Sequence, residues 1–168
     1  YRFSGYWKDV GTIDSLWDAN MDMLAVDSGV QLFDPTWPIY ARTPTKPPHF
    51  MGSKAVVSHS MVTGGCEVYG EVENSVLFHS VRVEEGAQVK YSILMPGAVV
   101  KAGAVVEYAI VAENAVIGEG ARVGAPPEDD KPEEWGIAVV AEGIKVGDGA
   151  RIPAKSMVTR NVKSGGVR

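Results

Sequence analysis

Residues 93–123 read ILMPGAVVKAGAVVEYAIVAENAVIGEGARV, and an aliphatic side chain returns at every sixth position of this stretch. The repeat positions are Ile93, Val99, Val105, Val111, Ile117 and Val123. A small residue follows four positions after each of the first five, at Gly97, Gly103, Ala109, Ala115 and Ala121. A helix repeats its apolar residues every three to four positions and a half-buried strand every two, so neither explains a period of six. The period is typical of a hexapeptide repeat.

The geometry that fits this period is a triangular prism, with one hexad on each flat side and about eighteen residues in each coil. We expect the aliphatic residues to point inward and the small residues to fit the corners. Short similar segments that begin at Ser75, Ser92 and Ala109 recur every 17 residues and support a coil of this size. An eighteen-residue coil would stack Lys101 on Glu119 of the next coil, with their Cβ atoms about 5 Å apart.

The same rhythm extends over most of the chain. It runs upstream through Val56, Val62, Val68, Leu77, Val83 and Val89, and downstream through Val140, Val146, Ile152 and Val158. Residues 125–136 break it with three prolines and five acidic residues, which predicts a protruding loop whose Trp135 packs back on the prism. The predicted fold class is mainly β: a single-stranded left-handed parallel β-helix over residues 53–168, preceded by a short helix and an extended linker.

The first fifty residues lack the rhythm. Thr12 can cap a helix, with Asp14 in the first turn. The apolar face of this helix would consist of Ile13, Leu16, Trp17, Met21 and Leu24. Five prolines between residues 35 and 48 predict an extended linker over residues 29–52. Because the chain starts with Tyr1, we interpret residues 1–28 as the end of a preceding domain, against which the helix face would pack.

Composition excludes several function classes. The 168 residues carry a formal net charge of −5, which argues against a nucleic-acid surface. Charges interrupt the apolar stretches, so we expect no membrane span and, without a signal peptide, a cytoplasmic protein. The single cysteine, Cys66, follows Val62 by four residues and is interpreted as a core residue instead of a nucleophile.

Several motifs carry a resemblance to a known family. They are Tyr6-Trp-Lys-Asp-Val-Gly-Thr12, Leu32-Phe-Asp-Pro-Thr-Trp-Pro-Ile-Tyr40, Gly64-Gly-Cys66, Ser75-Val-Leu-Phe78 and Met95-Pro-Gly-Ala98. In this order they resemble the end of the catalytic domain, the bridge and the β-helix of glucose-1-phosphate adenylyltransferases, the ADP-glucose pyrophosphorylases of bacterial glycogen synthesis.

The resemblance implies an enzyme that makes ADP-glucose and pyrophosphate from ATP and glucose 1-phosphate with Mg²⁺. It implies that Asp9 is one of two metal-binding aspartates and that Trp7 shapes the sugar-phosphate pocket. Taken alone, Asp9 would be an acid that caps the helix or interacts with its dipole. The glycine-rich nucleotide loop and the second metal aspartate of the family have no counterpart here. We therefore expect this chain to be an inactive regulatory and assembly part of a homotetramer or heterotetramer.

An anionic effector such as a sugar phosphate is a further implied partner. Enteric relatives bind it with arginines, and the aligned positions here are Glu113 and Glu142. Nearby basic residues, Lys145, Arg151 and Lys155, are expected to be exposed side chains of a charged prism. The identity of the effector stays open.

Two alternatives remain. Some hexapeptide-repeat proteins are trimeric acyltransferases in which a histidine is the general base, and His59 or His79 could have that role. A related regulatory subunit without catalytic activity is the second alternative, although the intact segment around Asp9 favours the catalytic kind.

Overall fold

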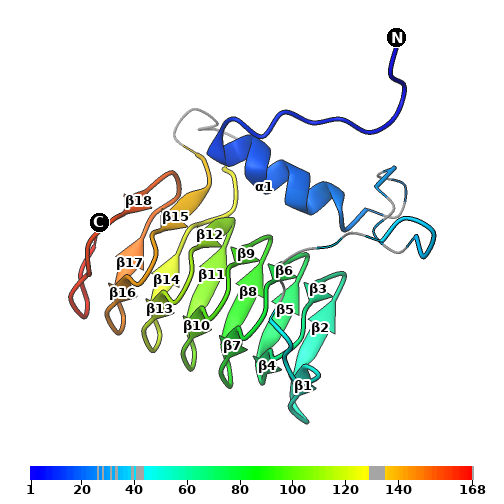
Figure 1. The fold of residues 1–168 in the computed structure, drawn as a ribbon. Helices are drawn as coiled ribbons and strands as arrows, with labels where there is room; N and C mark the ends of the chain where they lie inside the picture. Colours follow the sequence, from blue (N-terminus) through cyan, green and yellow to red (C-terminus); the bar gives the residue numbers. More distant parts are fainter. Residues whose placement is uncertain are drawn as a thin grey trace.

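The computed structural model describes residues 1–25, 27, 29–30, 32, 34–38, 40, 44–128 and 135–167. Most of them form a parallel solenoid with three sheets of six strands around a triangular core (Figure 1). Each turn contributes one strand to each sheet, so neighbours in a sheet come from successive turns. The predicted fold class is confirmed.

The strands are two or three residues long and pair in parallel throughout. Sheet A contains β1 (Phe50–Met51), β4 (Glu67–Val68), β7 (Arg82–Val83), β10 (Val99–Val100), β13 (Val116–Ile117) and β16 (Lys145–Val146). Sheet B contains β2 (Val56–Ser58), β5 (Glu71–Glu73), β8 (Gln88–Lys90), β11 (Val105–Glu107), β14 (Arg122–Val123) and β17 (Arg151–Ile152). Sheet C contains β3 (Met61–Val62), β6 (Val76–Leu77), β9 (Ile93–Leu94), β12 (Ala109–Val111), β15 (Ala138–Val140) and β18 (Met157–Val158).

The central coils contain 17 residues, as the pairing of Ile93 with Ile110 and of Val99 with Val116 shows. The eighteen-residue stacking of Lys101 on Glu119 is therefore wrong. Val100 pairs with Ile117, and the next amide, that of Lys101, donates to Ile117 O at 3.0 Å, so Glu119 lies one residue past the position opposite Lys101.

The coil is one residue shorter than the expected eighteen because one of its three corners is shorter than the other two. There the chain turns through a single residue with left-handed backbone geometry, Tyr91 (φ 48°) in one coil and Tyr108 (φ 49°) in the next. Non-glycine residues adopt this conformation only rarely. The inward residues Val106 and Val111 on either side of Tyr108 are therefore five positions apart instead of six.

The predicted inward residues of the first three hexads are also wrong by one position. Leu94, Val100 and Val106 are fully buried in the core, whereas Val99 and Val105 point outward and are half-buried. Ile93 is buried, but on the outer side of sheet C. Val56 likewise points outward and is 59% exposed.

The remaining predicted core positions are confirmed. They belong to one core cluster or pack against it: Val62, Val68, Leu77, Val83, Val89, Val111, Ile117, Val123, Val140, Val146, Ile152 and Val158. Cys66 is also in this cluster, as predicted. Its Sγ–H donates to Phe78 O at 3.0 Å, and burial raises the pKa of the thiol, which disfavours the reactive thiolate.

A serine ladder stabilises the single-residue corner. The amide of Ser92 donates to Ser75 Oγ, and the amide of Ala109 donates to Ser92 Oγ, both at 3.1 Å. Each hydroxyl in turn donates a hydrogen bond of 2.7 Å to the carbonyl oxygen two residues earlier, Ser75 to Glu73 and Ser92 to Lys90. Ser75 and Ser92 are fully buried, so the ladder pairs amides that water cannot reach.

Ser92→Ala is expected to lower the free energy of unfolding by about 1–3 kcal/mol, because it leaves the buried Ala109 amide without its acceptor. Urea denaturation followed by circular dichroism would measure the change. Ser58→Ala, at an exposed position of β2, is the control and should change stability by less than about 0.5 kcal/mol. Equal effects of the two substitutions would contradict a structural role of the ladder.

Helix α1 (Ile13–Asp22) begins as predicted. The Ser15 amide donates to Thr12 Oγ1 at 3.1 Å, and the Thr12 amide donates to Ser15 Oγ at 3.0 Å, a reciprocal capping box. The expectation that its apolar face packs against a preceding domain is wrong, because the face packs on the solenoid of the same chain. It packs on the outer side of sheet C, over Ile93, Ile110 and Ile137 (Figure 1).

Aromatic contacts fix the helix to the solenoid. Trp17 Nε1 donates to Tyr91 O at 2.7 Å, and the Trp17 ring lies 5.9 Å from that of Tyr108. Tyr108 stacks on Tyr91 at 4.8 Å and meets Trp135 edge-on at 5.5 Å. Trp135 also donates to Ala125 O at 2.8 Å, which confirms that it packs back on the prism; residues 129–134 of the predicted loop lie outside the described residues.

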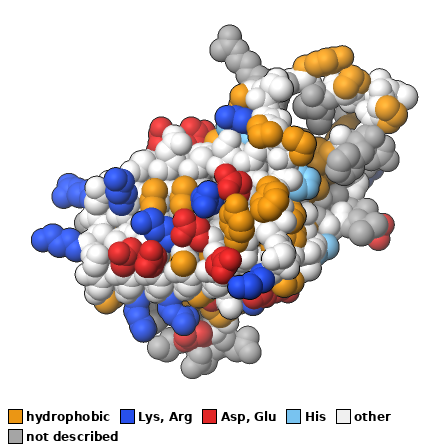
Figure 2. All heavy atoms as spheres, turned by 90° about the horizontal axis from the view of Figure 1, so that it is seen from below, with side chains coloured by type: hydrophobic (Ala, Val, Ile, Leu, Met, Phe, Trp, Pro, Cys, Tyr) orange, Lys and Arg blue, Asp and Glu red, His pale blue; other side chains and the backbone are white. Residues whose placement is uncertain are grey.

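The linker joins the solenoid earlier than the predicted boundary at residue 53, because β1 begins at Phe50. Just before it, Pro47 O accepts a hydrogen bond from the Gly65 amide at 2.7 Å. In the described part of the chain, no helix is both long and apolar enough to span a membrane. Figure 2 shows acidic and basic side chains mixed over the face seen from below, with Lys and Arg gathering toward the C-terminal end.

Candidate functional site

The segment before α1 carries the two residues assigned from the resemblance. Trp7 is 76% exposed and Asp9 is exposed. Thr12, and not Asp9, caps the helix, so the capping interpretation of Asp9 is wrong. Across the described ranges, no hydrogen bond or ion pair involves the Asp9 carboxylate, which leaves its oxygens available for a ligand.

A magnesium site at this segment would need ligands in addition to Asp9. Mg²⁺ binds oxygen ligands and usually combines one or two carboxylates with substrate phosphates. Asp9 fits as one such carboxylate. The described residues contain no group of three or more His, Cys, Asp or Glu side chains that could hold a metal ion.

An ion pair positions the backbone beside Asp9. Lys8 Nζ lies 2.7 Å from Asp22 Oδ2 of α1, and the Tyr6 hydroxyl donates to the same oxygen at 3.0 Å. The hydrogen bond from Lys8 is the main reason that the pKa of Asp22 is lowered, and the same bond raises the pKa of Lys8. The segment is thereby held along the helix.

The ion pair between Lys8 and Asp22 predicts that the pKa of Asp22 depends on Lys8. Because the pKa of Asp22 is lowered in the folded chain, its interaction with Lys8 is fully present above the usual carboxyl range and is lost as the pH falls through the lowered value. We expect Lys8→Met to raise the pKa of Asp22, measured by NMR of the side-chain carboxyl carbon. Lys163→Met, near the other end of the chain, should leave that pKa unchanged. An Asp22 pKa that Lys8→Met does not move would contradict the pairing.

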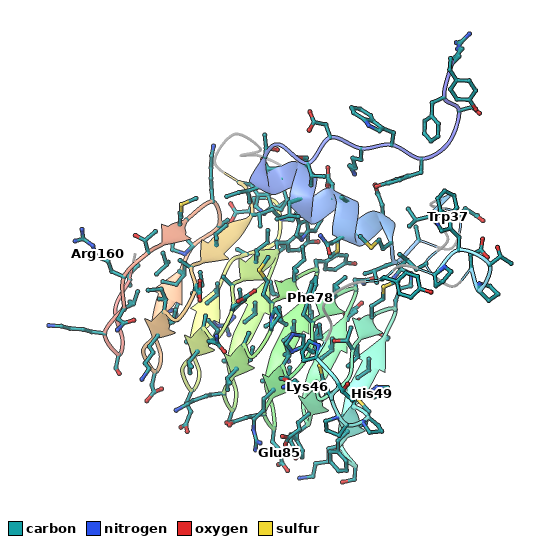
Figure 3. The ribbon with its side chains drawn as sticks, viewed as in Figure 1. Trp37, Lys46, His49, Phe78, Glu85 and Arg160 are labelled. Atoms are coloured by element: carbon teal, nitrogen blue, oxygen red, sulfur yellow. The ribbon has the colours of Figure 1, made fainter. Side chains whose placement is uncertain are left out.

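A groove of about 690 Å³ lies where the linker meets the solenoid. Its lining residues are Pro44, Thr45, Lys46, Thr63, Gly64, Phe78, His79, Pro96 and Glu113. Lys46 and Phe78 lie near one another in the N-terminal half of the solenoid (Figure 3). The groove therefore joins linker residues, which precede β1, to residues from successive coils.

One corner of the prism forms the solenoid side of the groove. Backbone hydrogen bonds stack this corner column, which we define as Gly64, His79, Pro96, Glu113 and Glu142. The amides that follow His79, Pro96, Glu113 and Glu142 each donate to the member one coil earlier, at 2.9–3.3 Å. Glu113 and Glu142, 29 positions apart in sequence because of the loop insertion, are thus neighbours.

The groove combines opposite charges with apolar surface. Lys46 supplies an ammonium group, and His79 supplies an imidazole whose Nδ1 lies 3.5 Å from Ser80 Oγ. The side chain of Phe78 is 37% exposed, and Glu113 lies at the exposed corner. No ion pair to Lys46 is present in the portion of the chain that the structure describes. The site can hold a small molecule that carries an anionic group beside an apolar or ring-shaped part.

The other residues considered from the sequence do not line this groove. Lys145, Arg151 and Lys155 are exposed, as expected, and Arg151 pairs in register with Arg122 on the outer side of sheet B. His59 lies at a different corner from His79, where its Nδ1 is 2.6 Å from Asn74 Oδ1. The two histidines are therefore not brought together.

Sequence reasoning missed Lys46 and the groove role of His79. The available signal was the recurrence of the two-residue corner at Gly64, His79 and Pro96, one coil apart. Lys46 gave no signal, because it lies in the linker and reaches the groove only through the fold.

Comparison with known proteins places these features in a family. A sequence model of the GlmU-like, C-terminal hexapeptide family matches residues 46–147, more than half of the chain. The chain belongs to this family. The match includes most of the solenoid of this hexapeptide protein and seven of the nine groove residues, all except Pro44 and Thr45.

Individual relatives agree with the resemblance seen in the motifs. Glucose-1-phosphate adenylyltransferase from Bacillus mycoides (strain KBAB4) is 50% identical over 98 residues, which cover 58% of this chain and 26% of that protein. The enzyme of the same name from Clostridium perfringens (strain SM101 / Type A) is 51% identical over 96 residues, 57% of this chain and 25% of that protein. The similarity to glucose-1-phosphate adenylyltransferases is confirmed, and the matched part of the chain spans about a quarter of these relatives.

Proposed function

We propose that this chain is the C-terminal regulatory and assembly part of an enzyme that makes ADP-glucose and pyrophosphate from ATP and glucose 1-phosphate in glycogen biosynthesis. The observation that carries the proposal is the 50% identity with relatives named glucose-1-phosphate adenylyltransferase. The resemblance of the segment from Tyr6 to Thr12 to the metal motif of these enzymes supports it independently of the solenoid.

In the proposed reaction a phosphate oxygen of glucose 1-phosphate attacks the α-phosphorus of ATP, and the bond from that phosphorus to pyrophosphate breaks. Bound Mg²⁺ would neutralise charge on the phosphates. Asp9 would supply one of its carboxylate ligands, and the exposed ring of Trp7 would contact the sugar-phosphate side. The ion pair between Lys8 and Asp22 would hold this segment in place.

The chain alone is expected to make no ADP-glucose when supplied with ATP, glucose 1-phosphate and Mg²⁺. Asp9 is its one proposed metal ligand, and the described ranges hold no group of three or more His, Cys, Asp or Glu side chains that could bind the ion. A coupled assay for pyrophosphate measures this. The intact Bacillus mycoides relative is the positive control. Turnover by the purified chain would contradict the proposed division between catalytic and regulatory parts.

The groove is the proposed binding site for an anionic effector. The support is its unpaired Lys46, the neighbouring His79 and the exposed Phe78 ring, which together offer an ammonium group and an imidazole beside apolar surface. A ligand there would contact the linker and the coils at once, and could change how the linker sits on the solenoid. Tetramers of one or two subunit types are part of the same proposal.

Lys46→Met is expected to weaken binding of a sugar bisphosphate such as fructose bisphosphate to the chain by about tenfold, the cost of one charge-assisted hydrogen bond. Isothermal titration calorimetry measures the dissociation constant. Lys163→Met, distant from the groove, is the matched control and should bind as the unmodified chain does. If Lys163→Met weakened binding as much as Lys46→Met, the anion would not be held in the groove.

A further inference from the structure

The polar contacts of the segment that carries Asp9 all lead to helix α1. In the part of the chain that the structure describes, residues 1–11 form hydrogen bonds and ion pairs only with acidic side chains of α1. The shortest joins Lys8 Nζ to Asp22 Oδ2 at 2.7 Å, and the Tyr6 hydroxyl donates to the same oxygen. The position of the Asp9 carboxylate therefore depends on where α1 lies.

The surface under α1 repeats from coil to coil. The outward residues of sheet C pair in register along the solenoid and are all apolar: Met61, Val76, Ile93, Ile110, Val139 and Met157. Figure 1 shows α1 lying across successive strands of this row. Because apolar contact is not directional and neighbouring strands are about 4.8 Å apart, the row offers similar contacts at each step of one coil. Burial alone does not fix α1 along the solenoid.

One directional contact ties α1 to a particular coil. Trp17 Nε1 donates to Tyr91 O at 2.7 Å. Within the described ranges this carbonyl accepts no other hydrogen bond, because the Ala109 amide of the next coil donates to Ser92 Oγ instead. The serine ladder thus leaves the carbonyl of Tyr91 open for the indole of Trp17.

The corresponding carbonyl one coil later is occupied. Ala109 stands there in place of the ladder serine, and the Ala138 amide donates directly to Tyr108 O at 3.1 Å. Trp17 contacts Tyr108 through its ring, with the ring centres 5.9 Å apart. The indole N–H and the indole ring therefore contact two successive coils, which holds α1 at one position on sheet C.

From these contacts we infer that Trp17 is a positioning residue for Asp9 in the proposed nucleotidyl transfer, and the inference rests on that proposed function. Trp17 acts through α1, whose Asp22 holds the segment next to Asp9. Trp17 and Asp22 are five residues apart, about 7.5 Å along the helix, so a tilt or shift of α1 moves the segment with it. Misplacing a catalytic group by about 1 Å can lower a rate about a hundredfold. The solenoid would thus contribute to the metal site without supplying a ligand.

Trp17→Phe tests the inference, because phenylalanine keeps an apolar ring against sheet C but cannot donate to Tyr91 O. In the full-length enzyme proposed above, the half-saturating Mg²⁺ concentration should rise about threefold to tenfold, near the lower end of what the loss of an outer partner costs a metal site. The Michaelis constant for ATP at saturating Mg²⁺ should stay within about twofold. An enzyme that was merely less stable would lose rate at every Mg²⁺ concentration and would not show this shift.

Trp135→Phe is the matched control. It makes the same substitution in the same aromatic cluster, but the N–H that it removes donates to Ala125 O at 2.8 Å and does not hold α1. The half-saturating Mg²⁺ concentration should change less than about twofold. Equal shifts in the two variants would overturn the inference, and so would a Trp17→Phe enzyme that folds normally by circular dichroism and shows no shift.

NMR of the chain itself gives a second measurement, which does not depend on catalysis. In ¹H–¹⁵N spectra of Trp17→Phe, the amide signals of Lys8 and Asp9 should move, although both residues precede the substitution by a full helix turn or more. In Trp135→Phe they should stay in place. Failure of the proposed function is recognised separately, because the unsubstituted enzyme would then form no ADP-glucose at any Mg²⁺ concentration. In that case unmoved Lys8 and Asp9 signals would still overturn the link from Trp17 to this segment.

Asp22→Asn keeps the inference testable if Trp17→Phe does not fold. It breaks the next contact in the series by removing the charge that holds Lys8. The half-saturating Mg²⁺ concentration should rise about tenfold, and the amide signals of Lys8 and Asp9 should move. A folded Asp22→Asn variant without either change would overturn the inference.

Discussion

Val106→Asp is expected to destabilise the chain by about 4 kcal/mol or more, or to prevent folding, because it places an unpaired carboxylate in a dry core. Val106 is 0% exposed and lies between Val89 and Val123 of the neighbouring coils. No charge of opposite sign is available among these partners. Urea denaturation followed by circular dichroism measures the loss.

Val105→Asp, one position earlier, is the matched control. Val105 points outward and pairs in register with Gln88 and Arg122, so an aspartate there gains an opposite charge worth about 0.2–1 kcal/mol. We expect near-normal stability. If Val105→Asp were the more damaging of the two, the inward positions of the solenoid would be those of the simple six-residue count, and the register described here would be incorrect.

Asp9→Asn is expected to lower the formation of ADP-glucose about a hundredfold to a thousandfold in an active enzyme that contains this chain. The substitution keeps the size of the side chain but removes the charge of the carboxylate that we propose as a metal ligand, at the position where phosphate charge would be stabilised. The N-terminal portion of the Bacillus mycoides relative, joined ahead of Tyr1, is expected to provide such an enzyme. The initial rate at saturating ATP and glucose 1-phosphate is the measurement.

Asp14→Asn is the control for this experiment. Asp14 is an exposed carboxylate in the first turn of α1, five residues from Asp9, and its loss removes only a weak interaction with the helix dipole. The rate should change less than about twofold. Equal losses from both substitutions would indicate that they disturb the helix, and Asp9 would then have no role as a metal ligand.

Much of the fold could be predicted because its strongest determinants are local. The six-residue repeat specifies a parallel coil, and Thr12 followed by an apolar face specifies the start of α1. The serine and tyrosine corners were not predictable in the same way. Tyr91 and Tyr108 adopt a left-handed conformation that the residue type disfavours, and only the surrounding coil enforces it.

One ambiguity in the sequence produced two errors. At β10 and β11 valines stand at both the inward and the outward position, so hydrophobicity alone cannot tell which of Val99 and Val100 faces the core. Counting Val99 as inward also placed Ile93, six positions earlier, in the interior, although Leu94 is the residue that faces the core. With Ile93 counted as core, the apolar outer side of sheet C was hidden, and α1 was expected to pack on another domain instead of on it.

The candidate site was predictable only in part. Glu113 was noted because it aligns with an effector-binding arginine of enteric relatives, and Asp9 and Trp7 were noted from a motif. Lys46 comes from an irregular linker, more than thirty residues before Phe78 and His79, and no period connects them. Such a groove depends on where the chain crosses its own coils, which local patterns do not encode.

ADP-glucose formation by the joined enzyme is the most informative measurement. With ATP, glucose 1-phosphate and Mg²⁺, the catalytic portion of the Bacillus mycoides relative joined to this chain should form ADP-glucose and pyrophosphate at a rate comparable with that of the intact relative. The proposal would be contradicted by a folded fusion protein that forms no ADP-glucose under conditions in which the intact relative does.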